Sequence, residues 1–103
     1  MGIKKQYVKN KPKCNVTFRY GAPQPIKAET VKILGDFNRW SKDCEPMKKL
    51  ENGEFTQTIE FDSEKEYQFR YLLDDKLWDN DPEADKEIHS GQGAEDFNSV
   101  VVV

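Results

Sequence analysis

Two tryptophans follow turn signals directly, at positions where no strand pattern requires them to be buried. Trp40 ends the polar segment GDFNRW, and Trp78 comes shortly after an Asp-Asp-Lys turn. Neither residue is in phase with the inward-facing set of a neighbouring strand. An indole held at the surface of a stiff scaffold can stack on a flat, amphipathic ligand, because its π-cloud is partly negative and attracts polarised C–H groups. The positions of Trp40 and Trp78 therefore predict two exposed stacking surfaces.

Two polar residues are expected beside these tryptophans. Arg70 points outward from the strand that leads to the Trp78 turn, and Asn98 lies near the start of the last strand. A pyranose ring presents C–H groups on its face, whereas its rim of hydroxyls needs hydrogen-bond donors and acceptors such as a guanidinium and an amide. The candidate carbohydrate-binding residues are therefore Trp40, Arg70, Trp78 and Asn98. The alternative is that each tryptophan fills the core or packs a loop. Composition and spacing alone do not favour either the binding role or this structural role.

Catalytic chemistry is not supported by the acidic residues or by the single histidine. A glycosidase needs two carboxylates about 5 to 9.5 Å apart across a cleft. Asp74 and Asp75 are adjacent, so an extended chain would send them to opposite faces. Triad chemistry would depend on His89, in a segment that we interpret as a Gly-rich loop. We expect no catalytic residue, and hence a module that is not an enzyme.

Metal ligation is not expected either. The alternating acids of residues 79–85 resemble the start of a calcium loop, but the sixth position is Ala84, where an EF-hand loop requires glycine. We interpret this segment as a polar loop. Cys14 and Cys44 have neither CxxC spacing nor a nearby histidine, so neither a zinc site nor a redox motif is supported, and buried reduced thiols are favoured over a disulfide. No metal or cofactor is predicted.

Length and charge exclude several other classes of function. The chain has 103 residues, which is enough for one domain with a modest core. Charged residues make up 34%, and the net charge is −3, which argues against a nucleic-acid partner. No stretch approaches the ~20 apolar residues of a membrane span, and no apolar signal-peptide core is present. We expect a soluble, cytoplasmic protein without a membrane partner.

Period-two alternation is the main structural signal, and it recurs in short runs such as CNVTFRY and YQFRYLL. About seven such strands, spaced by turns and without a convincing helix, predict an all-β, immunoglobulin-like antiparallel β-sandwich. The second run should place its aromatic residues inward and Gln68, Arg70 and Leu72 outward. Lysine-rich residues 1–12 are expected to form a flexible tail, which leaves 13–103 as a single domain. Residues 79–85 and 89–96 are expected to form a long polar loop.

The chain resembles a known family in four segments: VKILGDFNRWS, PMKKLENGEFTQTIEF, YQFRYLLDDKLWDNDP and FNSVVVV. These segments are similar to those of the family-48 carbohydrate-binding modules, also called isoamylase N-terminal or early-set domains. The glycogen-binding domain of the AMP-activated protein kinase β subunit belongs to this family. The resemblance covers about residues 12–103, and its most specific elements are the G-D-F-N-x-W turn and the Trp followed by Asp81-Pro82.

The resemblance implies roles for the four candidate residues. Trp40 and Trp78 would stack on glucose rings as an exposed tryptophan platform, and Arg70 and Asn98 would hydrogen-bond to the sugar. The implied function is non-catalytic binding of α-1,4-glucan, such as glycogen, starch or maltooligosaccharide. The alternative is an early-set module that packs against a glucan-active catalytic domain without binding sugar. A docking surface of that kind should be ringed by apolar residues, and Leu72 and Leu77 keep this alternative open.

Overall fold

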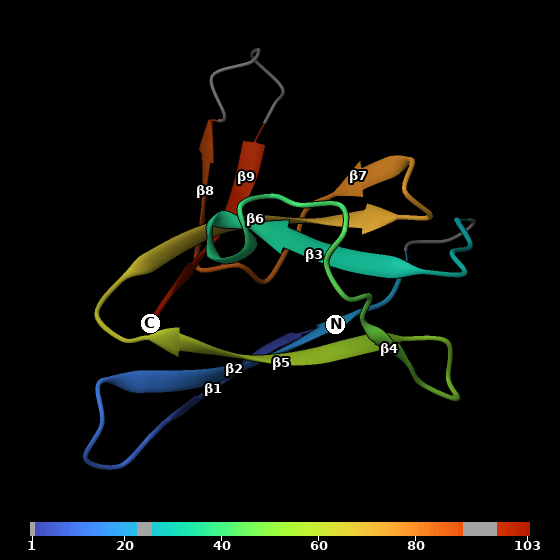
Figure 1. Cartoon of the computed structure of the whole chain (residues 1–103). Helices are drawn as coiled ribbons and strands as arrows, with labels where there is room; N and C mark the ends of the chain where they lie inside the picture. Colours follow the sequence, from blue (N-terminus) through green and yellow to red (C-terminus); the bar gives the residue numbers. More distant parts are fainter. Residues whose placement is uncertain (1, 23–25, 90–96) are drawn as a thin grey trace.

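The computed structural model describes residues 2–22, 26–89 and 97–103, and these residues form two antiparallel β-sheets packed face to face (Figure 1). They contain no α-helix and one short 3-10 helix, η1 (Asp36–Asn38). The predicted immunoglobulin-like β-sandwich of early-set type is therefore confirmed. The strands are β1 (Gly2–Tyr7), β2 (Lys13–Tyr20), β3 (Val31–Gly35), β4 (Lys48–Lys49), β5 (Phe55–Asp62), β6 (Glu66–Leu73), β7 (Leu77–Asp79), β8 (Lys86–His89) and β9 (Phe97–Val102).

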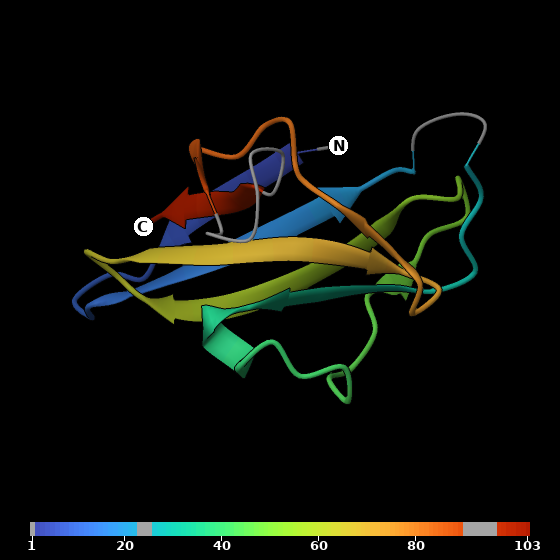
Figure 2. The same ribbon diagram turned by 90° about the horizontal axis from the view of Figure 1, so that it is seen from above.

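Each sheet is built from strands that are distant in sequence. The first sheet has the order β1-β2-β5-β4, and the second has the order β3-β6-β9-β8, with β7 paired to β6. From above, β3 and β6 overlie β5 and β2 with similar strand directions, as in an aligned sandwich (Figure 2). In the same view, the segment that joins η1 to β4 passes beside β3, which forms an edge of the second sheet.

The core follows the predicted alternation. In β2 every second residue is buried, and in β6 the inward-facing aromatic residues meet those of β2. The Phe18 ring lies 5.1 Å from that of Phe69 and 6.2 Å from that of Phe61, both in edge-to-face geometry, which aromatic pairs prefer. The buried core residues are Cys14, Val16, Phe18, Tyr20, Val31, Ile33, Met47, Phe55, Phe61, Phe69, Tyr71, Leu73, Val101 and Val103.

The prediction of a tail at residues 1–12 is wrong for its first half. Strand β1 pairs along its whole length, from Gly2 to Tyr7, with residues 14–19 of β2. Ile3 packs against the core, and the Lys5 ammonium donates to both carboxylate oxygens of Asp85, at 2.9 and 2.8 Å. Lysines conceal this strand in the sequence, because the ion pair uses an inward-facing position that usually carries an apolar residue.

The prediction of a long loop after Trp78 also needs correction. Residues 86–89 form β8, which pairs with β9. Its four side chains are all exposed, so the strand lacks the alternation by which a half-buried strand is recognised. His89 lies at the end of β8 with its ring centroid 4.3 Å from that of Phe97. Of the predicted loop, residues 80–85 do connect β7 to β8 without a strand, and residues 90–96 lie outside the described residues.

No helix among the described residues has the length and apolar character required to cross a bilayer.

Candidate functional site

The segment that presents Trp40 begins with a glycine that no other residue can replace without a clash. A Cβ on Gly35 would lie 2.3 Å from the backbone oxygen of Gln68 in the neighbouring strand. The backbone of Gly35 is extended, so close approach rather than φ requires the glycine. Asn38 then holds the turn, since its Oδ1 accepts from Gly35 N at 3.0 Å and its Nδ2 donates to Ile33 O at 2.9 Å. The backbone N–H of Trp40 donates to Gly35 O at 3.0 Å and closes the turn.

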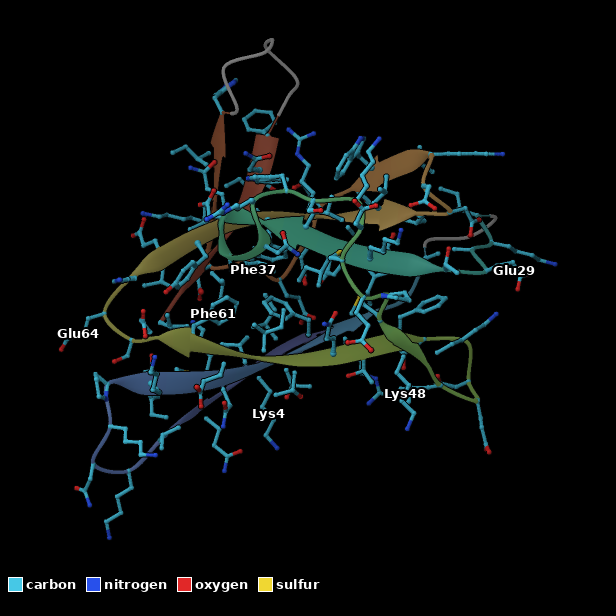
Figure 3. All side chains as sticks on the ribbon, viewed as in Figure 1. Lys4, Glu29, Phe37, Lys48, Phe61 and Glu64 are labelled. Carbon is cyan, nitrogen blue, oxygen red and sulfur yellow. The ribbon has the colours of Figure 1, made fainter. Side chains whose placement is uncertain are left out.

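The aromatic residues of this turn point to opposite sides. Phe37 faces the core, where its ring lies 5.1 Å from that of Phe61, and both residues are labelled in Figure 3. Arg39 and Trp40 both have left-handed backbone angles, with φ of 57° and 56°. Two successive residues in this region reverse the chain within a short distance. Trp40 is thereby directed away from the core, and it is half-buried.

Asp36 orients the Trp40 indole. Its Oδ1 accepts from Trp40 Nε1 at 3.2 Å, and its Oδ2 accepts from the backbone N–H of Gln68 at 2.9 Å. A single carboxylate therefore connects the indole to strand β6. Asp36 was not among the predicted site residues, although it lies four residues before Trp40 and is the acidic residue of the predicted turn.

Trp78 is presented by the hairpin that joins β6 to β7. Asp74 and Asp75 both have positive φ, 51° and 57°, as the first residues of its tight turn. The Asp74 carboxylate accepts the backbone N–H groups of Thr30 and Glu29, at 2.9 and 2.8 Å, and these hydrogen bonds lower the pKa of Asp74. The predicted Asp-Asp-Lys turn is thus confirmed, and it is attached to the chain just before β3.

The two indoles are brought together on the outer face of the second sheet. Their ring centroids are 6.5 Å apart, and the planes are inclined at 60°. Trp78 is 39% exposed and is paired with Leu72, so both side chains are on the same face. Leu72 faces outward as predicted, but it is only 1% exposed, and Leu34 on the same face is 0% exposed. Both leucines lie outside the inner core cluster, so the segments carrying the tryptophans cover this part of the sheet.

Arg70 and Asn98 lie on the same outer face and are already joined to each other. Arg70 is paired with Leu34, and its Nε donates to Asn98 Oδ1 at 2.5 Å. The Asn98 amide donates in turn to Gln68 Oε1 at 2.8 Å, and Asn98 is 8% exposed. The structure therefore places all four predicted residues on one face of the sheet. Gln68 was predicted to point outward but was not named as a site residue. Its position two residues before Arg70 in an alternating strand is the signal that places it beside Arg70.

A lysine contributes positive charge beside the second indole. Lys42 Nζ lies 6.0 Å from the Trp78 ring centroid, within the range of a cation–π interaction. Its backbone oxygen accepts from Lys32 Nζ at 2.7 Å, and that ammonium also donates to Asp75 Oδ1 at 2.9 Å. These contacts connect the loop that carries Trp40 to the hairpin that carries Trp78.

The acidic segment after Trp78 is a loop from residue 80 to residue 85, as predicted, but the aspartates just before it and near its start are bound to tyrosine hydroxyls. Asp81 is 1% exposed and accepts from the Tyr71 hydroxyl at 2.7 Å, while Asp79 accepts from the Tyr20 hydroxyl at 2.5 Å. The pKa of both tyrosines is raised well above the usual value, chiefly by burial. The nearby aspartates raise it further, because each accepts the phenolic proton in a hydrogen bond and carries a negative charge. In the described part of the chain, no three His, Cys, Asp or Glu side chains are grouped so as to hold a metal ion.

The raised tyrosine pKa values predict a loss of stability at alkaline pH. Unfolded tyrosines ionise near pH 10, whereas folded Tyr20 and Tyr71 keep their protons, so the free energy of unfolding should fall by about 1.4 kcal/mol per pH unit per tyrosine above pH 10. Urea denaturation between pH 8 and 11.5 measures this slope. Tyr71→Phe should reduce it, whereas Tyr7→Phe, at a residue that is 59% exposed, should not. An equal slope in wild type and Tyr71→Phe would contradict the prediction.

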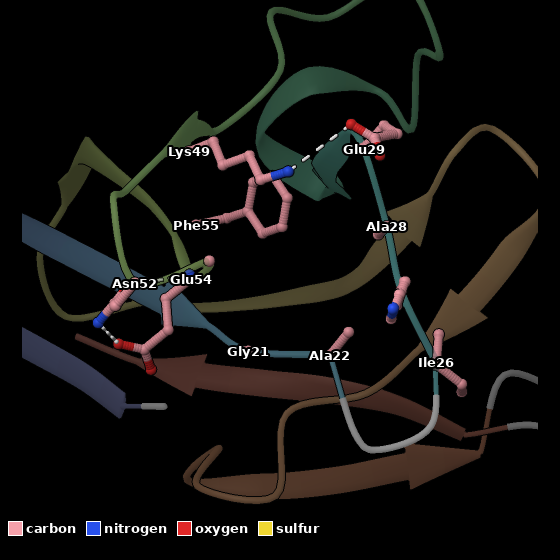
Figure 4. Close-up of a pocket in the computed structure, with 11 residues that line it drawn as sticks. Gly21, Ala22, Ile26, Ala28, Glu29, Lys49, Asn52, Glu54 and Phe55 are labelled. Atoms are coloured by element: carbon pink, nitrogen blue, oxygen red, sulfur yellow. Dashed lines mark hydrogen bonds and ion pairs between the residues drawn. The ribbon is translucent and has the colours of Figure 1, made fainter.

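A pocket of about 360 Å³ lies at one end of the sandwich (Figure 4). Phe55 and Ala28 contribute to its lining, and Lys49 and Glu29 form an ion pair across it at 3.7 Å. Its lining includes none of the four candidate residues. The tryptophan surface and this pocket are therefore separate features of the described structure.

Comparison with known proteins identifies the family. A search of curated proteins finds no match. The family model for carbohydrate-binding module 48 (isoamylase N-terminal domain) matches residues 6–84. The matched region contains Trp40, Arg70 and Trp78, whereas Asn98 lies beyond it. The match covers most of the chain, and members of the family are binding modules. The chain therefore belongs to the family of carbohydrate-binding module 48, the isoamylase N-terminal domain.

Proposed function

We propose that this module binds α-1,4-glucan without catalysing a reaction on it. The observation that carries the proposal is the pair of indoles, 6.5 Å apart on one face of a rigid sheet. Trp40 and Trp78 form the stacking platform, and Arg70 supplies donors for the sugar hydroxyls beside it. Asn98, at 8% exposure and bonded to Arg70, acts mainly by orienting the guanidinium.

The angle between the indoles supports a curved ligand. Successive glucose rings in an α-1,4-linked chain turn relative to one another, whereas a β-1,4-linked chain is an extended, flat ribbon. A flat ribbon would require nearly coplanar rings, but the planes of Trp40 and Trp78 are inclined at 60°. Two surfaces at this angle match neighbouring rings of a helical α-glucan.

The surroundings of the indoles favour sugar over a docked protein. A docking surface should be ringed by exposed apolar residues. Of the two leucines that kept that alternative open, Leu72 is buried beneath the site. Leu77 is 47% exposed, but it is paired with inward-facing Leu73, so its side chain is not on the face of Trp78. Polar side chains of Arg70, Gln68 and Lys42 lie on this face instead, and these suit a ligand with a rim of hydroxyls.

Nitrogen-correlated NMR tests the proposal most directly, since the chain has two tryptophans and each indole N–H gives one signal. We expect maltoheptaose to shift both indole signals, together with the side-chain signals of Arg70 and Asn98. Cellohexaose is the control and should leave these signals in place. If millimolar maltoheptaose moves none of them, the proposed glucan site is wrong, and the tryptophans should be tested as a docking surface for a glucan-active catalytic domain.

A further inference from the structure

Strand β7, which carries Trp78, has little support from its own sheet. It has three residues and pairs with the last three residues of β6. Among the described residues, this ladder is its one strand pairing. Two of its side chains, Leu77 and Trp78, are exposed. So short a ladder supplies few backbone hydrogen bonds, and the position of Trp78 must depend on other contacts.

The residue after Trp78 provides such a contact across the whole sandwich. Asp79 Oδ2 accepts from the hydroxyl of Tyr20 at 2.5 Å, and Tyr20 belongs to β2 in the opposite sheet. Tyr20 is fully buried, and its ring lies 4.3 Å from that of Tyr71, with the planes inclined at 34°. The packed ring fixes the hydroxyl in place, and the hydroxyl fixes the carboxylate.

The chain beyond Asp79 is attached to β9, so both ends of this segment are held. Asn80 Nδ2 donates to Phe97 O at 3.0 Å, and the backbone N–H of Asp81 donates to Ser99 Oγ at 2.9 Å. If Asp79 moved, the residues after it would therefore stay in place, and Trp78 and the hairpin before it would move.

We propose that Tyr20 is a positioning residue for the sugar site: from the opposite sheet, its hydroxyl holds Asp79 and thereby sets the position of the Trp78 indole. The proposal rests on the glucan-binding function proposed above. Without the hydroxyl, Asp79 Oδ2 loses its partner at the core, and among the described residues only Oδ1 keeps one, the backbone N–H of Asn80 at 2.9 Å. A half-buried carboxylate oxygen without a partner is costly, so the carboxylate turns toward water. Its neighbour Trp78 then moves relative to Trp40.

Tyr20→Phe tests this inference, because it removes the hydroxyl and keeps the packed ring. We expect the indole N–H signal of Trp78 to shift in the ligand-free protein, and the Kd for maltoheptaose to rise about tenfold, as a displaced stacking ring would produce. The matched control is Tyr67→Phe, which removes another tyrosine hydroxyl bond, to Asp62 O at 3.3 Å. This control should leave both the Trp78 signal and the Kd unchanged.

A second pair of variants keeps the test informative if Tyr20→Phe folds poorly. Asp79→Asn retains an oxygen that accepts from Tyr20, so its Kd should stay close to that of wild type, whereas Asp79→Leu should raise the Kd as Tyr20→Phe does. A loss of stability with an unmoved Trp78 signal and an unchanged Kd would overturn the inference and leave Tyr20 a core residue. If wild type itself binds no glucan, the proposed function fails, and the ligand-free Trp78 signal still decides the role of Tyr20.

Discussion

Trp78→Ala is expected to raise the Kd for maltoheptaose about 30-fold, which corresponds to about 2 kcal/mol. The indole is 39% exposed and is paired with Trp40 at 6.5 Å, so its loss removes half of the proposed platform. Trp40→Ala should have an effect of similar size, since a ligand that spans both rings loses one stacking contact in either variant. Isothermal titration calorimetry measures the Kd, and the NMR spectrum shows whether the fold is retained.

The control for this prediction is Leu77→Ala. Leu77 is the neighbour of Trp78 in β7 and is 47% exposed, so its removal changes apolar surface without removing a stacking ring. Its Kd should stay within about twofold of wild type, because isolated surface substitutions usually have small effects. Equal affinities for wild type and a folded Trp78→Ala variant would rule out the platform. A loss of affinity in Leu77→Ala as large as in Trp78→Ala would instead show that any truncation in β7 lowers the affinity, whether or not a stacking ring is lost.

Gly35→Ala is expected to destabilise the protein by about 3 kcal/mol, at the upper end of the range for overpacking. The added Cβ would lie 2.3 Å from the backbone oxygen of Gln68 and 2.7 Å from the Phe37 ring. A backbone oxygen in a central strand cannot rotate away, so β3 must separate from β6. Urea denaturation measures the loss of free energy of unfolding, and glucan affinity should fall with it, because Gly35 starts the turn that positions Trp40.

Gly21→Ala is the matched control for this substitution. A Cβ at Gly21 would meet the Glu54 side chain at 3.5 Å, which is an ordinary van der Waals contact. We expect its free energy of unfolding to remain within about 0.5 kcal/mol of wild type. If Gly35→Ala were as stable as Gly21→Ala, the close approach of β3 and β6 at this point would not be a constraint on the sequence.

Local patterns were sufficient to predict the sandwich and to nominate the site. In residues 14–20 and 67–73, apolar and polar side chains alternate along the chain, because only one face of each strand is turned toward the core. This alternation is visible in the sequence alone. Turn residues identified the hairpin before β7 as well. The same reasoning failed for β1, where Lys5 occupies an inward position through its ion pair with Asp85, and for β8, whose side chains are all exposed. In both strands the pairing partner, rather than the local pattern, decides the structure.

For this protein, the sequence by itself determined the fold class, the two turns that present Trp40 and Trp78, and the outward direction of Arg70, because each follows from residues close together in the chain. Only the tertiary structure decided the angle and distance between the indoles and the burial of Leu72 beneath them. It also decided the hydrogen bond from Tyr20 to Asp79, two residues that are 59 positions apart. These features depend on how distant strands pack, and no local pattern specifies such contacts.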